Sequence, residues 1–570
     1  MKIGFNIRYI LRILLTLFLF SCQSIEPKHK ESVNKNIRLN QIGYHPKSNK
    51  QFILADTTAT QFQLLNYQQE TVYTGRVMFN GNWGPSGEAV YMGDFSSFEV
   101  PGTYQVIVNE RTSYPFEIKA NLYQEAWHAS IKSYYFQRAS LPIEKEFDSL
   151  FYRAAGHPDM RCFYHPSSGK TSGFLASPGG WYDAGDYGKY VVNGALSTGQ
   201  MLLLYALYPQ AVADQTLHIP ESGNGVSDLL DELKYELDWL LTMQDEDGGV
   251  FHKLTAKNFS GFISPEAYDL DRYVIGKGTA ASLGFAAVLA QAARLLAPTH
   301  ELWSQLALRA AKKAWKWAQL NPQMAFSNPD DVKTGEYGDT QFDDDFYWAA
   351  AELYLATQEA MYLNYLQSNK ETYQHQPTNS WKFFTRNVGF ASLLIHQELI
   401  DSKLYETLKK EHLLLSDSLL EVINHHPYRI ALNTFEWGSN SDILNQALLL
   451  CLAHQLTAEE KYLIGAEQIT DYVFGKNATG YSFLTGFGSK RVRLPHHRPS
   501  GADRILKPIP GFIVGGPNGD RQDQQEVTYT SALPAKAYQD VQPSYASNEV
   551  CLNWNAPAVF VLGYILQVRN

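Results

Sequence analysis

The sequence predicts two domains, a small β-sandwich followed by a larger all-α domain, and three observations support this division. Residues 36–119 contain short segments such as Gly102–Val108, in which apolar residues alternate with smaller or polar ones, and turn residues separate these segments. After residue 122 the apolar residues recur at helical spacing. The chain also has 570 residues, which is more than one domain usually holds.

Two kinds of helix are predicted in the second domain, which spans residues 122–570. Residues 226–243 carry leucines on one face, with Ser227 as the expected N-cap, and so predict an amphipathic helix. Residues 279–297 are rich in alanine and apolar all round, which is typical of a helix buried on every side. Further helices are expected at Glu301–Leu320, Asp343–Thr357, 442–454 and 459–474. This alternation indicates an inner ring of helices inside an outer ring, with loops forming one functional face.

The net charge indicates which partners the protein could bind, and the cysteine content indicates whether disulfides stabilise it. The net charge is −10 at pH 7 and no long run of Lys or Arg is present, which argues against nucleic acid as a partner. An uncharged substrate fits better, and aromatic residues make up 13% of the chain, as suits a carbohydrate-binding protein. Only Cys162, Cys451 and Cys551 follow Cys22, and this odd, widely spaced set is no disulfide framework.

The N-terminus predicts export. Basic residues precede and enter an apolar stretch, residues 10–20, that is too short to span a bilayer comfortably and has the shape of a signal peptide. The sequence Leu-Phe-Ser-Cys at 19–22 resembles a bacterial lipobox, so residues 1–22 are expected to be a lipoprotein signal peptide with Cys22 as the lipid acceptor. A plain secretory signal is the alternative. The polar residues 23–35 then form a tether, and the expected location is the bacterial outer membrane, on its periplasmic side or at the cell surface.

A glycine-rich acidic stretch at residues 179–190 is the first candidate site. Asp183 and Asp186 are three residues apart, which on a helical turn would place both carboxylates on one side, where they could hold a water molecule. Aromatic rings beside carboxylates suit the apolar face of a sugar and the acid–base cleavage of its linkage. The alternative for these residues alone is a turn with solvated or capping aspartates.

Two stretches near the C-terminus add further candidates. Residues 482–498 contain His496 and Arg498, whose donors could grip sugar hydroxyls and hold a carboxylate; a basic surface loop is the alternative. Residues 538–555 place Glu549 among aromatic residues. Desolvation there could raise its pKa and keep a proton available at neutral pH, whereas a salt-bridged or solvated glutamate is the alternative.

Together these stretches resemble glycoside hydrolase family 9, the inverting endoglucanases, in the subgroup with an N-terminal immunoglobulin-like domain. The resemblance covers nearly everything from Asn36 onward and rests on Asp-Ala-Gly-Asp at 183–186, on 482–498 and on 538–556. One departure is Cys551, at a place usually held by Ser, Thr or Ala. The fold it implies is an immunoglobulin-like β-sandwich over 36–119 followed by an (α/α)6 barrel over 122–570.

The resemblance also implies a role for each candidate residue. Asp186 is the expected general base, Asp183 its helper in orienting water, and Glu549 the general acid, with Asp186 and Glu549 roughly 6.5–9.5 Å apart for inversion. His496, the fourth expected catalytic residue, is expected with Arg498 to contact the sugar and to organise the acid side. Contacts with substrate are expected from Arg498, Trp554, Asp540 and Tyr545.

The implied activity is that of a monomeric endo-β-1,4-glucanase acting on cellulose or a related β-glucan, with a lipid anchor holding it at the membrane. An exo-acting cellodextrinase or β-glucosidase and a xyloglucanase are alternatives with the same mechanism. A noncatalytic glycan-binding surface lipoprotein is an alternative of another class, although a binder has no need of an acid opposite two bases.

Metal binding differs from the pattern that the resemblance implies. Relatives often carry a zinc ion held by two cysteines and two histidines, but Ala139 and Tyr182 stand where two of these ligands would be. Cys162, with His157 or His165 nearby, is all that remains, so no zinc is expected. A structural calcium ion stays open, because its ligands would be scattered loop oxygens.

Overall fold

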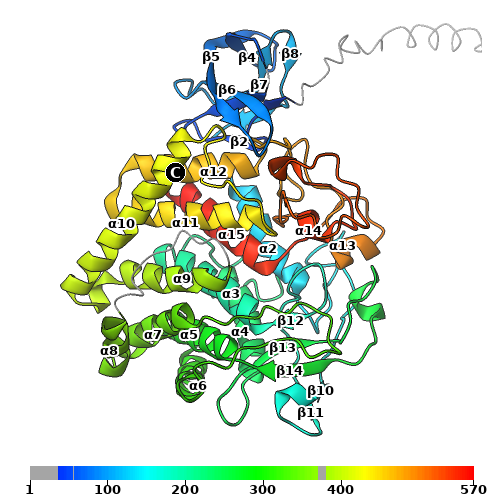
Figure 1. Ribbon diagram of the computed structural model, residues 1–570, viewed down its shortest axis with the longest axis vertical. Helices are drawn as coiled ribbons and strands as arrows, with labels where there is room; N and C mark the ends of the chain where they lie inside the picture. The colour runs from blue at the N-terminus through cyan, green and yellow to red at the C-terminus, as the bar shows by residue number, and fades with distance from the viewer. Residues whose placement is uncertain (1–35, 56, 370–380) are drawn as a thin grey trace, which may run out of the picture.

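The computed structural model describes residues 36–55, 57–369 and 381–570, and it shows a sheet-rich domain beside a larger helical domain (Figure 1). The expected signal peptide with Cys22 and the expected tether at 23–35 lie outside the described residues.

The N-terminal domain contains nine strands among the described residues, in the order β1-β3-β6-β5-β4-β7-β9-β2, with β8 paired to β7. Their bounds are β1 Ile37–Arg38, β2 Gly43–Tyr44, β3 Gln51–Ala55, β4 Gln61–Leu65, β5 Thr71–Trp83, β6 Glu88–Asp94, β7 Gly102–Val108, β8 Arg111–Thr112 and β9 Phe116–Ile118. The long strand β5 pairs with β4 through its first half and with β6 through its second. Aromatic rings fill the core between these parts, with Phe52 and Phe62 meeting edge to face at 4.8 Å. The expected sheet-rich domain is therefore present.

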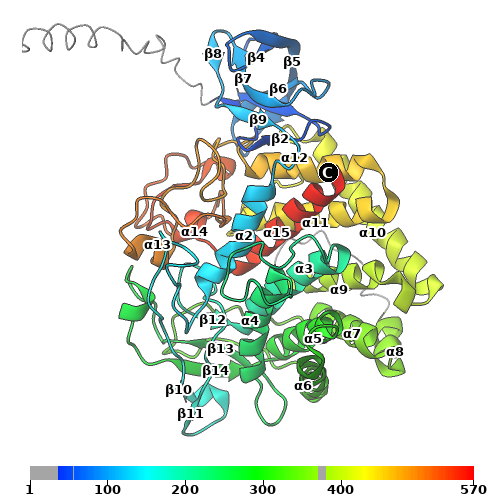
Figure 2. The same cartoon turned by 180° about the vertical axis from the view of Figure 1, so that it is seen from behind.

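The second domain is mainly helical, as expected, and its segments are arranged as Figures 1 and 2 show. Its helices are α2 Gln124–Gln137, α3 Val191–Leu207, α4 Asp228–Thr242, α5 Thr279–Leu296, α6 Glu301–Leu320, α7 Asp343–Thr357, α8 Ala360–Ser368, α9 Trp381–Ile395, α10 Ser402–His425, α11 Ser439–Thr457, α12 Glu460–Val473, α13 Arg498–Ala502, α14 Tyr545–Asn548 and α15 Leu552–Arg569. Helices α3, α5, α7, α11 and α15 are buried over most of their length, whereas α6 and α10 bury one face each.

Helix α5 is the one helix in the described part of the chain that is long and apolar enough to cross a membrane, yet 89% of that stretch is buried inside the protein. It packs against α3, α6 and α7, which accounts for its apolar surface on all sides. The expected cap of α4 differs in detail. Ser227 occupies the N-cap position, but its hydroxyl donates a hydrogen bond to the Val212 carbonyl oxygen at 2.5 Å and does not cap the helix.

A small second sheet within the helical domain was not predicted. Its order is β11-β10-β14-β13-β12, formed by β10 Cys162–Tyr164, β11 Phe174–Leu175, β12 Lys189–Tyr190, β13 Phe251–Thr255 and β14 Tyr273–Lys277. Strand β12 pairs with β13, with Lys189 opposite Leu254. Because β12 ends the acidic stretch 179–190, this sheet fixes one end of that stretch, and α3 begins at the next residue.

A buried ion pair holds the two domains together. The Arg38 guanidinium lies 2.7 Å from a Glu88 carboxylate oxygen, and the Tyr428 hydroxyl of the helical domain donates to the same carboxylate at 2.6 Å. Arg38 and Glu88 are 7% and 5% exposed. Beside them, the Trp83 ring packs on Tyr428 with centroids 4.7 Å apart. The sheet domain is therefore fixed to the segment between α10 and α11.

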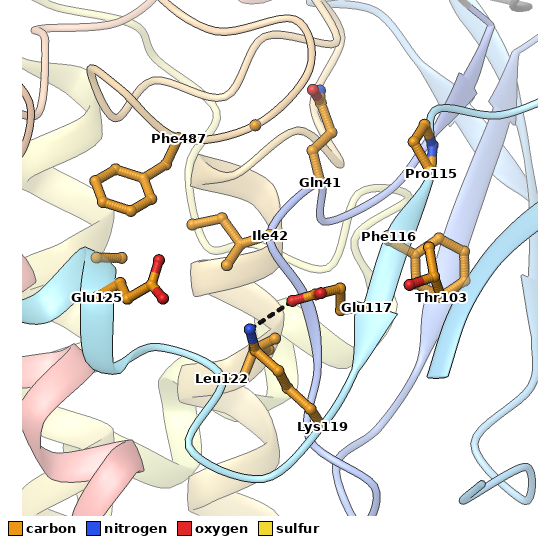
Figure 3. A pocket seen from close by; sticks show the side chains of 12 residues that line it. Gln41, Ile42, Thr103, Pro115, Phe116, Glu117, Lys119, Leu122, Glu125 and Phe487 are labelled. Carbon is orange, nitrogen blue, oxygen red and sulfur yellow. Dashed lines mark ion pairs between the residues drawn. The ribbon is translucent and has the colours of Figure 1, made fainter. Parts of the chain in front are cut away.

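The sheet domain also binds, through Gln41, the loop at residues 480–490 that leads toward the C-terminal candidate site. Gln41 donates to the Gly480 carbonyl oxygen at 2.8 Å and accepts from the Lys490 backbone N–H at 2.7 Å. Gln41 lies at the rim of a junction cavity of about 290 Å³ (Figure 3). In that cavity Lys119 and Glu117 form an ion pair at 2.5 Å, with both side chains more than 40% exposed.

Replacing Glu88 should test the junction. Glu88→Ala leaves Arg38 buried without its carboxylate, so the free energy of unfolding should fall by about 3–5 kcal/mol. Urea denaturation measures this change. The matched control is Glu117→Ala, which breaks an exposed pair and should cost at most about 1 kcal/mol. Equal losses in the two variants would contradict the role given to the buried pair.

Candidate active site

Residues 179–188 of the acidic stretch form an irregular loop with no helical turn, and residues 189–190 are strand β12. The Asp183 backbone N–H donates to the Gly188 carbonyl oxygen at 3.0 Å, and the Gly188 N–H donates to Asp186 Oδ2 at 2.9 Å. Such local side-chain bonds to the backbone compete with helix formation. Both aspartates are nevertheless brought to one cavity by this closed loop.

Two glycines in this loop allow neighbouring segments to lie very close to the loop backbone. Gly180 has a φ of +75°, and a Cβ there would lie 2.6 Å from the Trp239 ring. A Cβ on Gly185 would lie 2.2 Å from the His496 carbonyl oxygen and 3.1 Å from Glu549 Oε1. The loop therefore passes directly against the segments that carry His496 and Glu549.

Asp183 is held by two side-chain donors. Asn193 Nδ2 donates to Oδ1 at 2.8 Å, and the Tyr337 hydroxyl donates to Oδ2 at 2.6 Å. Burial, with the nearby charge of Asp186 adding to it, raises the pKa of Asp183 to about 7, while the two hydrogen bonds oppose the rise. Asp183 is therefore fixed in orientation and titrates near neutrality.

Glu549 has the environment of a proton donor. Its residue pairs with His496 in an isolated parallel bridge, and its carbonyl oxygen accepts from the Gly515 N–H at 2.9 Å. Burial raises the pKa of Glu549 well above its ordinary value; the charge of Asp186 adds to the rise, and Arg498 opposes it. The protonated form of the carboxyl group is consequently favoured.

Backbone pairing joins the two acidic segments. Ala184 forms an antiparallel bridge with Cys551, and the Leu552 N–H donates to the Asp183 carbonyl oxygen at 2.9 Å. The Cys551 thiol is buried against Asn193, whose Nδ2 lies 3.5 Å from Sγ. The side chain at this departure therefore forms part of the cavity wall.

His496 and Arg498 brace the backbone around the acids. His496 Nδ1 lies 2.8 Å from the Gln542 carbonyl oxygen, and burial lowers the pKa of the imidazole to about 4, so it is neutral. Arg498 donates to the Gly185 carbonyl oxygen at 2.9 Å and to the Ser260 carbonyl oxygen at 3.0 Å. Both residues lie beside the acidic residues but are not among those that line the cavity.

The cavity between the acids has a volume of about 290 Å³. Its walls come from five separate segments: Asp183, Ala184, Asp186, Tyr190, Phe259, Gly335, Glu336, Tyr337, Trp437, Glu549, Cys551, Asn553 and Trp554. Of these, Phe259 and Trp437 are 47% and 45% exposed, so their rings are open to a ligand. Four of these residues, Tyr190, Phe259, Tyr337 and Trp437, were not predicted from the sequence as site residues. The latter three lie in irregular loops that carry no periodic signal.

Asp540 and Tyr545, both expected to contact substrate, lie outside the cavity lining. Asp540 accepts from the backbone N–H groups of Arg493 and Leu494, at 3.0 and 2.9 Å, and so braces the loop before His496. The Tyr545 hydroxyl donates to a backbone carbonyl, and its ring packs against Trp437 with centroids 5.5 Å apart. Tyr545 therefore supports a ring that lines the cavity.

The residues around the position where relatives hold zinc make other hydrogen bonds. His157 Nδ1 and the Tyr182 hydroxyl are hydrogen bonded at 2.7 Å, and Cys162 Sγ donates to a carbonyl oxygen at 3.4 Å. His165 lies against Asp331, 3.1 Å from its carboxylate. This donor set does not fit a tetrahedral zinc ion. Within the described ranges, no three His, Cys, Asp or Glu side chains are grouped to hold a metal ion.

A carboxyl group of raised pKa that shares a cavity with two aspartates and with exposed aromatic rings is the arrangement of an enzyme that hydrolyses glycosidic bonds. Comparison with known proteins gives the family. Residues 123–562 match glycosyl hydrolase family 9, and residues 32–113 match the cellulase N-terminal immunoglobulin-like domain. The chain belongs to glycosyl hydrolase family 9.

Several relatives match over nearly the whole chain. A xyloglucan-specific endo-β-1,4-glucanase of Bacteroides ovatus is 39% identical over 550 residues, covering 92% of this chain and 93% of its own. Endoglucanase D of Acetivibrio thermocellus is 32% identical over 538 residues, covering 93% and 83%. Among solved structures, a family 9 protein of Bacteroides ovatus is 37% identical with a TM-score of 0.87, covering 94% of this chain and 100% of its own.

Proposed function

We propose that the protein is an endo-β-1,4-glucanase that hydrolyses a β-glucan with inversion at the anomeric carbon. The observation that carries this proposal is that Glu549, whose pKa is raised well above its ordinary value by desolvation, lines the same cavity as Asp183 and Asp186. The endoglucanases among the relatives, at 39% and 32% identity, support the same reaction and linkage.

Glu549 is the proton donor in this mechanism. Its raised pKa favours the protonated carboxyl, which can give its proton to the glycosidic oxygen as the bond to the anomeric carbon breaks. Arg498 opposes the rise in pKa, and it stabilises the carboxylate that remains after transfer. His496, neutral at this pH, positions the backbone beside the acid.

Asp186 is the base that accepts a proton from the attacking water. Its Oδ2 accepts from the Gly188 N–H, which orients the carboxylate. Asp183, fixed by Asn193 and Tyr337, helps to hold the same water. Attack on the face opposite Glu549 inverts the anomeric centre, and room for that water requires a separation between Asp186 and Glu549 of roughly 6.5–9.5 Å.

Aromatic rings hold the sugar chain in the proposed complex. Trp554, Trp437 and Phe259 come from three segments of the cavity wall and offer apolar faces to glucosyl rings. Cleavage inside a chain predicts that viscosity falls early relative to the release of reducing ends. An exo-acting cellodextrinase would show the reverse relation.

Xyloglucan is the second candidate substrate, because a relative that is 39% identical is named for it. The test is kcat/KM on soluble cellulose derivatives and on xyloglucan, with reducing ends and viscosity followed together. Hydrolysis of either polymer supports the proposed endo-acting enzyme, and the ratio identifies the preferred glucan. Absence of hydrolysis on both would overturn the proposal.

The Tyr337 hydroxyl should set the acid limb of the pH profile. Its hydrogen bond favours ionised Asp183, so Tyr337→Phe should raise the pKa of Asp183 further and move the acid limb of kcat/KM to higher pH. A hydrogen bond to a charged group is worth about 1.5–3 kcal/mol, which corresponds to a shift of about one pH unit or more. Tyr545→Phe, which removes a hydroxyl bonded to a backbone carbonyl, is the control. An unmoved limb in Tyr337→Phe would exclude this role.

The helices are proposed to form an (α/α)6 barrel. In support, α3 contacts α5 and α15, α7 contacts α5 and α9, and α11 contacts α15, which gives a run of neighbouring inner helices. Amphipathic helices such as α6 and α10 then form the outer ring.

Export and anchoring are proposed from the sequence. The lipobox-like residues 19–22 indicate acylation of Cys22 and attachment to the bacterial outer membrane, with a monomeric enzyme held on the tether 23–35. Mass spectrometry of the mature N-terminus tests this: a diacylglyceryl group on Cys22 is expected, and an unmodified N-terminus elsewhere would contradict it.

The mature enzyme is proposed to carry no zinc, and a structural calcium ion stays open. Elemental analysis of the purified protein separates these outcomes, since stoichiometric zinc would contradict the proposal.

A further inference from the structure

A second cavity, larger than the catalytic one, opens on the same side of the helical domain as α13. Its volume is about 690 Å³, within the range of about 300–1,000 Å³ that is usual for ligand sites. The residues that matter for its chemistry are Tyr152, Glu266, Asp503 and Arg504, while Phe151 and Pro499 form part of its apolar wall. Nothing in the reaction proposed above uses this cavity.

The two cavities share a wall. Phe259 lines the catalytic cavity, and Ser264 and Pro265, on the same loop, line the second one. The five residues from 259 to 264 can span at most about 18 Å, at 3.3–3.6 Å per residue, so the cavities are close. On the other side, Arg498 lies beside Glu549 and is followed directly by Pro499, a residue of the second cavity.

This wall is fixed to the catalytic residues. Arg498 Nε donates to the Ser260 carbonyl oxygen at 3.0 Å, and the Tyr187 hydroxyl donates to the Ile263 carbonyl oxygen at 2.6 Å. Between them, the Phe262 ring packs edge to face on His496, with centroids 5.1 Å apart. A ligand in the second cavity would therefore lie in a set position relative to the acids.

The chemistry of the second cavity suits a neutral sugar. Tyr152 is 54% exposed and combines an apolar ring with a polar end; the Lys145 ammonium lies 5.5 Å from the ring centroid. Asp503 accepts a hydrogen bond from the Ile505 N–H through Oδ1. Among the described residues, the second carboxylate oxygen of Asp503 and the side chains of Glu266 and Arg504 make no hydrogen bond or ion pair. The cavity therefore combines acidic hydrogen-bond acceptors with a basic donor. Sugar hydroxyl groups both donate and accept hydrogen bonds, so they match this combination better than a ligand of one charge would.

We propose that this second cavity binds sugar units of the same glucan chain, beyond those held between the acids. This inference rests on the proposed glucanase function and extends it. The units are either further backbone glucose or a branch sugar, and both present the same ring and hydroxyl chemistry to Tyr152 and Asp503.

The test is kcat/KM of Tyr152→Ala and Asp503→Asn on three substrates: cellotriose, cellohexaose and a branched xyloglucan oligosaccharide. Loss of a stacked ring should lower kcat/KM by about three- to tenfold on the longer substrates and leave cellotriose unchanged. A loss on both longer substrates identifies backbone units, and a loss on the branched one alone identifies a branch. Tyr152→Phe should retain activity. The control is Tyr67→Ala, at a tyrosine 83% exposed on the sheet domain.

Unchanged kcat/KM on both longer substrates, or an equal loss on cellotriose, would overturn the inference. The unmodified protein is assayed first, because its failure to cleave any of the three substrates counts against the proposed function instead. Calorimetric binding of the same oligosaccharides to the unmodified protein and to Tyr152→Ala needs no turnover. Equal affinities in that measurement would reject the second cavity as a sugar site whatever the reaction.

Discussion

Glu549→Gln should lower kcat on cellotetraose by about 10²–10⁴-fold, the usual effect of losing a general acid. Glutamine keeps the size of the side chain but has no acidic proton for the glycosidic oxygen. The cavity around Glu549 is closely packed, with a Cβ on Gly185 already 3.1 Å from its Oε1 position, so a residue of similar volume is the appropriate replacement. Initial rates of reducing-end release measure the loss.

A substrate with an activated leaving group separates the chemical role of Glu549 from a structural one. An aryl cellobioside whose phenolate leaves without protonation should be cleaved by Glu549→Gln with a much smaller loss than cellotetraose. Equal losses on the two substrates would mean that the substitution lowers activity by disturbing the cavity and not by removing the proton donor. Near-normal turnover of cellotetraose would remove Glu549 from the acid role.

Asp186→Ala should cause a loss of comparable size, about 10²–10⁴-fold in kcat, because no group then accepts the proton of the attacking water. The neighbouring Asp183 cannot replace it, since its two oxygens are held by Asn193 and Tyr337. The measurement is again cellotetraose hydrolysis.

Azide provides a sharper test of the base. The azide anion needs no deprotonation, so in Asp186→Ala it can attack the anomeric carbon while Glu549 protonates the departing oxygen, giving a glycosyl azide of inverted configuration. The unmodified enzyme should show no acceleration, which serves as the control. A glycosyl azide of retained configuration, or no azide product, would contradict the assignment of Asp186 as the base.

Helices and strands were predictable because a buried face requires apolar residues at a regular spacing in the sequence. Helices Glu301–Leu320 and Asp343–Thr357 have the predicted bounds, and so does strand β7. The five-stranded sheet was missed, since three of its strands are two or three residues long and show no alternation. Asp183 and Asp186 reach one cavity without a helical turn, because the Gly188 N–H donates to the Asp186 side chain and not along a helix.

The acids were identifiable from motifs, whereas the rest of the cavity was not. Phe259 and Trp437 lie in loops far apart in sequence, and only the fold brings their rings to the same cavity. Asp540 and Tyr545 are predicted substrate contacts in the same segment as Glu549, but neither lines the cavity. Proximity along a loop does not give the direction of a side chain, and Asp540 is turned toward the backbone of Arg493.

The central claim is that water attacks opposite Glu549 and inverts the anomeric carbon. Proton NMR at early times, with the purified enzyme acting on cellotetraose, shows which anomer forms before mutarotation mixes them. Direct displacement with Asp186 as base predicts that the α anomer appears first. If the β anomer appears first, cleavage proceeds with retention, and the roles given to Asp186 and Glu549 are contradicted.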